Sequence, residues 1–142
     1  MEKKYRLTDE TMKLGSITLH RIEAIRDFGN VKAGDKGGWI QSEDNLSHSG
    51  YCWVNDSAQV YEDAQIYEDA QIYGNAKVGG SALVGGTAKV YEKAQIYGNA
   101  RIYGYAQVGG YTQVYGYAQV YGYAQVGGYA QVGGFIYEPA RV

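Results

Sequence analysis

The 142-residue chain is poor in residues that make crosslinks, kinks or metal sites. It contains one cysteine, one proline and two histidines. The lone Cys52 allows no disulfide within the chain, which favours a reducing compartment such as the cytoplasm. Two histidines are too few for a zinc site built from three histidine ligands. We therefore expect neither a metal nor a cofactor.

Net charge and long apolar runs are also scarce. The formal charge is −2 without a basic block, so duplex nucleic acid is a poor candidate partner. Polar residues follow Met1 and no run of about 18 apolar residues occurs, so we expect no signal peptide and no membrane partner. In contrast, the chain has 21 glycines and 16 tyrosines. This excess indicates either a turn-rich fold or a low-complexity segment.

A six-residue repeat favours the turn-rich fold. From Val54 to Val132 every sixth residue is Val or Ile, and from Ala58 to Ala130 the residue four places after each is Ala, except Thr112. Because side chains alternate along a strand, the aliphatic residue and Ala share the inner face, whereas Gln and Tyr lie outside. The two remaining positions, rich in Gly, Asn and Asp, form a corner. Three such hexads close one triangular coil, a regularity that a disordered tail would have no reason to maintain.

This unit resembles the hexapeptide repeat of left-handed parallel β-helix proteins, which has an aliphatic residue, often Gly, two variable residues, a small residue and any residue. The resemblance implies the left-handed winding. We predict an all-β chain, with a left-handed parallel β-helix over 54–142 and a small N-terminal β cap. The segment 37–48, GGWIQSEDNLSH, followed by Trp53-Val54, is similar to uncharacterised hexapeptide-repeat proteins of phages and prophages. That similarity implies a phage or bacterial origin and, for a phage protein, the host cytoplasm.

The two ends depart from the repeat. Residues 1–53 should form the cap and an irregular first coil, with a strand over 17–25 and turns at 29–30 and 33–38. Ile40 and Leu46 are six apart, but the step from Leu46 to Val54 is eight, which predicts a two-residue bulge. After Val132 the next fitting start is Ile136, where a short cap begins, and Pro139 would stop further pairing.

Candidates for catalysis are few. Many hexapeptide-repeat proteins are acyltransferases, which typically use a histidine base, a loop that leaves the helix and a C-terminal helix. Here no loop interrupts 54–132, and His20 and His48 both precede the repeat. We expect Cys52, at an inward position, to be a core residue. Since no P-loop, CxxC or Ser-His-Asp pattern occurs, we expect no enzyme. An acyltransferase-like site between subunits, using His48, remains the alternative.

Paired acids and stacked tyrosines are the remaining surface features. Glu62-Asp63 and Glu68-Asp69 lie at consecutive corners, where solvated acids are favoured over a weak cation site. Residues 102–137 carry no charge. Steps of three hexads align Tyr105 with Tyr123, Tyr111 with Tyr129 and Tyr117 with Phe135 at corners, and Tyr97 with Tyr115 and Tyr103 with Tyr121 on flats. The candidate binding residues are Arg101, Tyr103, Tyr105, Tyr111, Tyr117, Tyr121, Tyr123, Tyr129 and Phe135.

These tyrosine rows have two interpretations. They stabilise neighbouring coils, or they form an interface, and both can hold on different faces. We favour a non-enzymatic binding or scaffold protein that forms a homo-oligomer, with a trimer favoured. The phage-like resemblance makes an inhibitor of a bacterial defence system, acting on a host protein, a specific version. The alternative is a sponge for a nucleotide signal, with bases stacked on tyrosine and Arg101 against phosphate.

Overall fold

The computed structural model describes residues 2–137 and is almost entirely β-structure. Strands β1 (Tyr5–Leu14) and β2 (Ile17–Ala24) form an antiparallel hairpin, to which β3 (Lys36–Ile40) is added before the one-turn helix η1 (Glu43–Asn45). Every later strand has two residues. These strands are β4 (Trp53–Val54), β5 (Gln59–Val60), β6 (Gln65–Ile66), β7 (Gln71–Ile72), β8 (Lys77–Val78), β9 (Leu83–Val84), β10 (Lys89–Val90), β11 (Gln95–Ile96), β12 (Arg101–Ile102), β13 (Gln107–Val108), β14 (Gln113–Val114), β15 (Gln119–Val120), β16 (Gln125–Val126), β17 (Gln131–Val132) and β18 (Phe135–Ile136).

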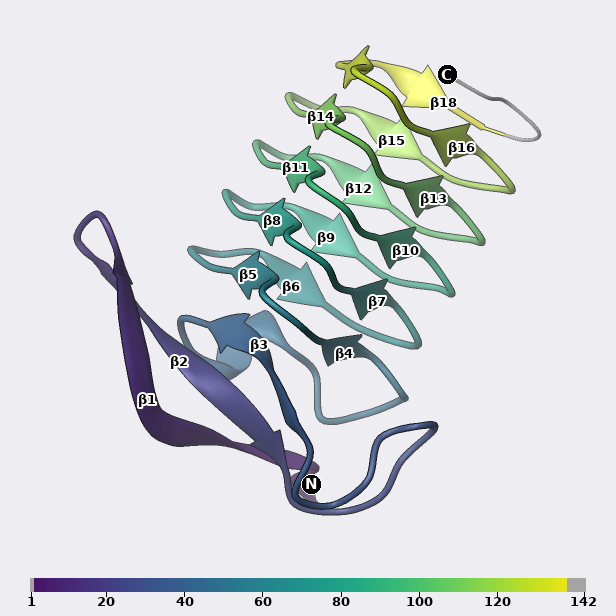
Figure 1. Ribbon diagram of the computed structural model, residues 1–142. Helices are drawn as coiled ribbons and strands as arrows, with labels where there is room; N and C mark the ends of the chain where they lie inside the picture. Colours follow the sequence, from purple (N-terminus) through teal and green to yellow (C-terminus); the bar gives the residue numbers. More distant parts are fainter. Residues whose placement is uncertain (1, 138–142) are drawn as a thin grey trace.

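The short strands form three parallel sheets, which are the faces of a triangular rod (Figure 1). Face 1 contains β4, β7, β10, β13 and β16, face 2 contains β5, β8, β11, β14 and β17, and face 3 contains β6, β9, β12, β15 and β18. Paired residues are three hexads apart, as Val90 and Val108 are. The chain crosses the near side from β4 to β5 and returns behind through β6 as it rises, so the coils wind left-handed (Figure 1). The predicted fold class is confirmed.

The core is the stack of small and branched side chains that the repeat predicts. The Val and Ile column is at most 3% exposed from Val54 to Val132, and the Ala column is completely buried from Ala58 to Ala124. Main-chain hydrogen bonds join each coil to the next, for example from Gln59 N to Ala76 O at 2.9 Å. Neighbouring coils therefore supply one another's backbone partners, so one coil cannot stand alone.

Both predicted shifts of the repeat are present. Leu46 bridges to Ile66, whereas Val54 pairs with Ile72. The separation in sequence between Leu46 and Ile66 is two residues longer than that between Val54 and Ile72. The predicted two-residue bulge therefore lies between Leu46 and Val54. At the other end Ile136 pairs with Val120, a step that is two positions shorter than the regular one.

The second shift overturns one predicted row. Phe135 pairs with Gln119 in the sheet and is not stacked with Tyr117. The step of three hexads fails there because this last coil is shorter than the others. The predicted C-terminal cap beyond Tyr137, including Pro139, lies outside the described residues.

The N-terminal segment continues face 2. Strand β3 pairs in parallel with β5, and the β1–β2 hairpin extends that sheet below the first coil (Figure 1). Lys4 is completely buried there, and its ammonium donates to the carbonyls of Gly50 at 3.1 Å and Cys52 at 2.8 Å. Carbonyls at this end of the rod thus gain a donor from the cap. In the described part of the chain no helix is long and apolar enough to cross a membrane.

Candidate functional site

Tyrosines on the flats serve largely to join coils. The rings of Tyr97 and Tyr115 stack with centroids 5.8 Å apart, and those of Tyr103 and Tyr121 stack at 5.0 Å, as the sequence predicts. Where the next coil has glycine, the ring covers it instead. A Cβ atom on Gly85 would lie inside van der Waals contact with the Tyr67 ring. Tyrosine in one coil and glycine in the next are therefore complementary in shape.

Tyrosines at the corners are different because they project into solvent. Tyr105 stacks on Tyr123 at 5.0 Å, and Tyr111 stacks on Tyr129 at the same distance. These four side chains are 51–80% exposed. Tyr117, at the third corner, is 77% exposed and has no stacking partner among residues 2–137.

The two stacked corner pairs border the same face. The corner between β12 and β13 carries Tyr105, the corner between β13 and β14 carries Tyr111, and the next coil repeats both. Face 1 at β13 and β16 is therefore flanked on both edges by tyrosine. Its floor is low at β16, because glycine replaces the outward tyrosine of earlier coils and a Cβ on Gly127 would meet nothing within 4 Å. At β13 the Tyr91 ring of the coil below covers Gly109. We call this surface the tyrosine-flanked face, formed by Tyr105, Gln107, Gly109, Tyr111, Tyr123, Gln125, Gly127 and Tyr129.

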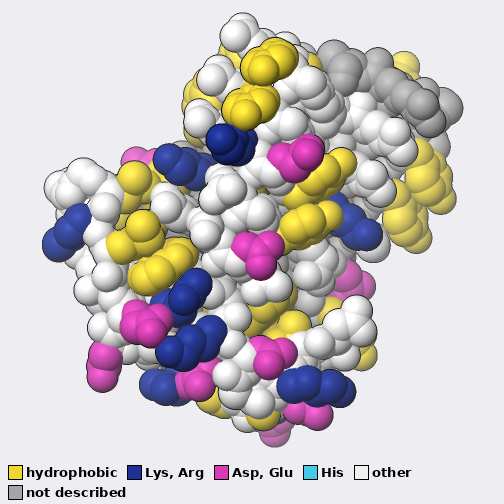
Figure 2. Space-filling view, in the orientation of Figure 1, with side chains coloured by type: hydrophobic (Ala, Val, Ile, Leu, Met, Phe, Trp, Pro, Cys, Tyr) yellow, Lys and Arg dark blue, Asp and Glu magenta, His cyan; other side chains and the backbone are white. Residues whose placement is uncertain are grey.

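The remaining predicted binding residues lie elsewhere. Arg101, Tyr103, Tyr121 and Phe135 are on face 3, where Tyr103 donates to Gln119 Oε1 at 3.2 Å. The structure thus separates the predicted set into two faces and the isolated Tyr117. Charged side chains gather over the cap and the early coils, and the upper coils show hydrophobic patches instead (Figure 2).

The acidic corner residues have a structural role that sequence reasoning missed. Glu62, Glu68 and Glu92 have positive φ angles of 54–56°. Each carboxylate accepts the backbone N–H of the glycine one coil later, at 2.7–2.8 Å. Across the described ranges no group of three His, Cys, Asp or Glu side chains is arranged to hold a metal. The carboxylates of Glu62 and Glu68 therefore bind backbone groups.

His48 is held in place by both ring nitrogens. Its Nε2 lies 2.8 Å from Glu43 Oε1, and its Nδ1 accepts the Lys4 N–H at 3.2 Å. The ring also stacks on Tyr5 at 4.1 Å. The His48 hydrogen bond, aided by Lys3, holds the pKa of Glu43 below its ordinary value. In this arrangement His48 has no free lone pair with which to act as a base.

Cys52 is a core residue, as predicted. Its side chain is completely buried, and burial raises the pKa of its thiol. Burial likewise lowers the pKa of Lys4, whose ammonium lies 3.5 Å from Cys52 Sγ. A buried thiol with a raised pKa lacks the thiolate character of a nucleophile.

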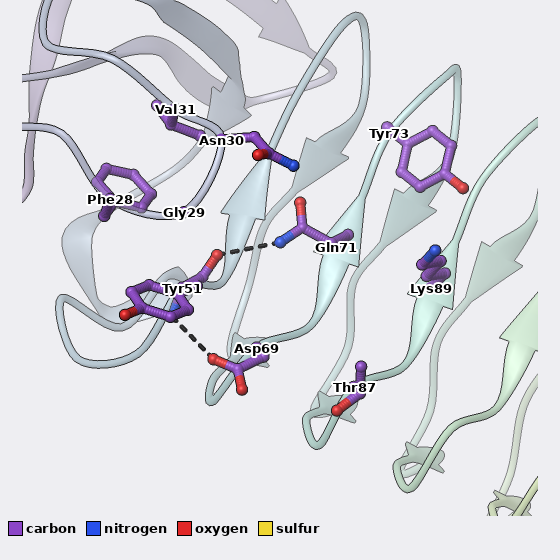
Figure 3. A pocket seen from close by; sticks show the side chains of 10 residues that line it. All are labelled: Phe28, Gly29, Asn30, Val31, Tyr51, Asp69, Gln71, Tyr73, Thr87 and Lys89. Atoms are coloured by element: carbon purple, nitrogen blue, oxygen red, sulfur yellow. Dashed lines mark hydrogen bonds between the residues drawn. The ribbon is translucent and has the colours of Figure 1, made fainter.

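A pocket of about 490 Å³ lies between the cap and face 1, and the sequence did not predict it. The turn at Gly29-Asn30 forms one side, Tyr73 and Lys89 form the other, and Asp69 and Gln71 lie between them (Figure 3). The turn itself was predictable, but its position over face 1 depends on how the cap packs.

Comparison with known proteins supports the same solenoid. Residues 70–86 and 94–110 match a family described as the YdcK β-solenoid repeat. The chain is also similar to the uncharacterized acetyltransferase YdcK of Escherichia coli (strain K12). The two are 36% identical over 66 residues, which cover 41% of this chain and 20% of that protein. The chain thus spans about a fifth of the curated relative that it matches. These matches support a hexapeptide-type β-solenoid.

Proposed function

We propose that the chain is a non-enzymatic binding or scaffold protein that self-associates through the tyrosine-flanked face. One observation carries the proposal: two stacked, exposed tyrosine pairs border a floor of glutamine and glycine that is open at Gly127. Residues 102–137 add no charge to this surface, and the nearest cation to its rim is Lys93 of the coil below, whose ammonium lies 5.3 Å from the centre of the Tyr111 ring. Large uncharged aromatic surfaces are typical of interfaces, and tyrosine contributes contact area at a low entropic cost.

Stacking favours binding because the rings are already ordered. A tyrosine side chain buries about 150–250 Å² when fully covered. The four corner side chains are on average about three-fifths exposed, so covering them would remove about 360–600 Å² from water, or about 9–15 kcal/mol before the costs of association. Those costs are of similar size, so the corner rings need the floor residues to form a stable contact.

A trimer suits the shape of the rod. In a triangular prism, the outward direction of a face and that of a neighbouring corner differ by about 60°. In a ring of three copies, the directions from one copy to its two neighbours also differ by about 60°. A heterologous contact between the tyrosine-flanked face of one copy and a tyrosine corner of the next would therefore close a ring at three copies. Tyr117 points away from such a contact.

Sedimentation velocity at micromolar concentrations tests self-association. Tyr105, Tyr111, Tyr123 and Tyr129 would be replaced together by serine, which the fold accepts at the corner positions of Ser57 and Ser81. We expect a trimer for the unmodified chain and a folded monomer for this variant. The control Tyr117→Ser should stay trimeric. An unmodified chain that sediments as a monomer contradicts the proposal.

The partner outside the oligomer is a separate question. The phage-like resemblance favours a host protein of a bacterial defence system, to be sought by pull-down. Sequestration of a nucleotide signal is the alternative, supported by the exposed Arg101 beside the stacked rings of Tyr103, Tyr121 and Tyr137. Native mass spectrometry with cyclic and linear nucleotides distinguishes the two, because a sponge must carry a stoichiometric nucleotide mass.

The name of the E. coli relative supports a competing proposal, an acyltransferase-like enzyme. Its only nominated base is His48, and the engagement of both ring nitrogens argues against that role. Incubation with acetyl coenzyme A and a panel of amines and alcohols tests it. Transfer that is lost in His48→Gln would overturn the non-enzymatic proposal.

A further inference from the structure

We infer that the pocket between the Phe28–Val31 turn and face 1 binds a small zwitterion with an apolar body, such as an α-amino acid. The pocket lies at the opposite half of the rod from the tyrosine-flanked face, so it is independent of self-association. Its volume of about 490 Å³ is within the range of small-molecule sites.

The wall of this pocket is built in advance of any ligand. Phe28 and Val31 exchange backbone hydrogen bonds of 2.9 and 2.8 Å, and Gly29 has a φ angle of 51°. The Phe28 side chain is only 6% exposed, with its ring edge-on to Trp53 at 5.2 Å and the Lys4 ammonium 4.8 Å away. Because the turn is anchored through Phe28, its tip keeps a fixed position over face 1.

Two opposite charges line the pocket without cancelling each other. The Asp69 carboxylate accepts the Tyr51 N–H through Oδ1 at 3.0 Å. Neither this carboxylate nor the Lys89 ammonium forms an ion pair within residues 2–137. The two residues belong to adjacent coils, about 4.8 Å apart along the axis. A ligand that offers an ammonium to Asp69 and a carboxylate to Lys89 would satisfy both.

The uncharged lining suits the rest of such a ligand. Gln71 donates through Nε2 to the Tyr51 carbonyl at 3.0 Å, which fixes the amide and leaves its Oε1 as an acceptor. Tyr73 stacks on Tyr91 at 5.4 Å, so its ring is also held. Burial raises the pKa of Tyr73, so its hydroxyl remains a donor at neutral pH. An apolar side chain would lie between this ring and the turn.

Titration of the whole chain, followed in ¹H–¹⁵N correlation spectra, tests the inference. The probes are L-phenylalanine, L-tyrosine, L-leucine and L-methionine at millimolar concentrations. We expect at least one to shift the amide signals of Gly29, Asn30, Tyr51 and Gln71. For phenylalanine, 3-phenylpropionate lacks the amine and 2-phenylethylamine lacks the carboxylate. Each analogue of a binding amino acid should bind about tenfold more weakly or worse, because one charge is left without a partner.

Two variants assign the charges. Lys89→Gln should weaken amino-acid binding about tenfold, and Asp69→Asn, which keeps the acceptor for Tyr51, should do the same. Lys77→Gln is the control, since Lys77 has the equivalent outward position on β8 of face 2. The inference is overturned if no amino acid shifts the pocket signals, if an analogue binds as tightly as its parent, or if Lys77→Gln weakens binding as much as Lys89→Gln.

Discussion

The corner at Glu92 allows backbone strain and a side-chain hydrogen bond to be measured separately. Glu92 has a φ angle of 54°, and its Oε1 accepts the Gly110 N–H at 2.7 Å. A residue with a Cβ in this left-handed region costs about 1–2 kcal/mol. A hydrogen bond to a charged group gives back about 1.5–3 kcal/mol when shielded, and less at an exposed corner. The two contributions should nearly balance, which explains why both glutamate and glycine occur at this position of the repeat.

Three substitutions separate the two contributions. Glu92→Ala keeps the strain and loses the bond, so the free energy of unfolding should fall by about 1–2 kcal/mol. Glu92→Gly loses the same bond but relieves the strain, so it should cost about 1 kcal/mol less than alanine. Glu92→Gln keeps an acceptor and should stay within about 0.5 kcal/mol of the unmodified chain. The expected order of stability therefore places glycine above alanine.

Urea denaturation followed by circular dichroism measures these differences, at concentrations low enough to suppress association. Lys93→Ala at the same corner is the control, because Lys93 has no positive φ, and it should change stability by less than about 0.5 kcal/mol. Equal stability of the alanine and glycine variants would refute the strain argument. A glutamine variant as unstable as alanine would refute the hydrogen bond.

Three further predictions concern the cap and the coils. The hydrogen bond to His48 lowers the pKa of Glu43, so the Glu43 carboxylate contributes stability at neutral pH, and this contribution is lost as pH falls below about 4.5. Urea unfolding at several pH values should therefore show Glu43→Gln less stable than the unmodified chain at neutral pH, with a smaller difference in acid. Gly85→Ala brings a Cβ into the Tyr67 ring and should cost about 1–3 kcal/mol in thermal or urea unfolding, but less in a Tyr67→Ala background. Thr112→Val should raise the unfolding free energy by about 1 kcal/mol, since the completely buried hydroxyl has no hydrogen-bond partner in the described chain; an unchanged urea midpoint would contradict this.

The solenoid could be predicted because its determinants are local and periodic. The inward column from Val54 to Val132 fixes which side chains are buried. Even the bulge after Leu46 and the shift to Ile136 follow from the spacing of branched residues. The prediction that Phe135 stacks on Tyr117 was wrong, because it used a fixed step of three hexads. The change in spacing between Val132 and Ile136 shows that this step does not hold in the last coil.

The pocket and the corner hydrogen bonds could not be predicted in the same way. The pocket depends on Phe28 packing against Trp53, a contact between residues without a common period. Strand β1 was also missed, since its residues alternate poorly between apolar and polar types. Glu62 has a positive φ, a backbone conformation that favours glycine. It is explained by the next coil, where the Gly80 N–H donates to the Glu62 carboxylate.

Uniform coils also determine how such a gene can change in length. A duplication of one whole coil of three hexads would lengthen the rod by about 4.8 Å and leave every face in its original direction. A duplication of a single hexad would keep the core intact but turn the tyrosine-flanked face by about 120° relative to the cap. The angular position of the tyrosine surface with respect to the N-terminal pocket is thus set by the number of hexads between them.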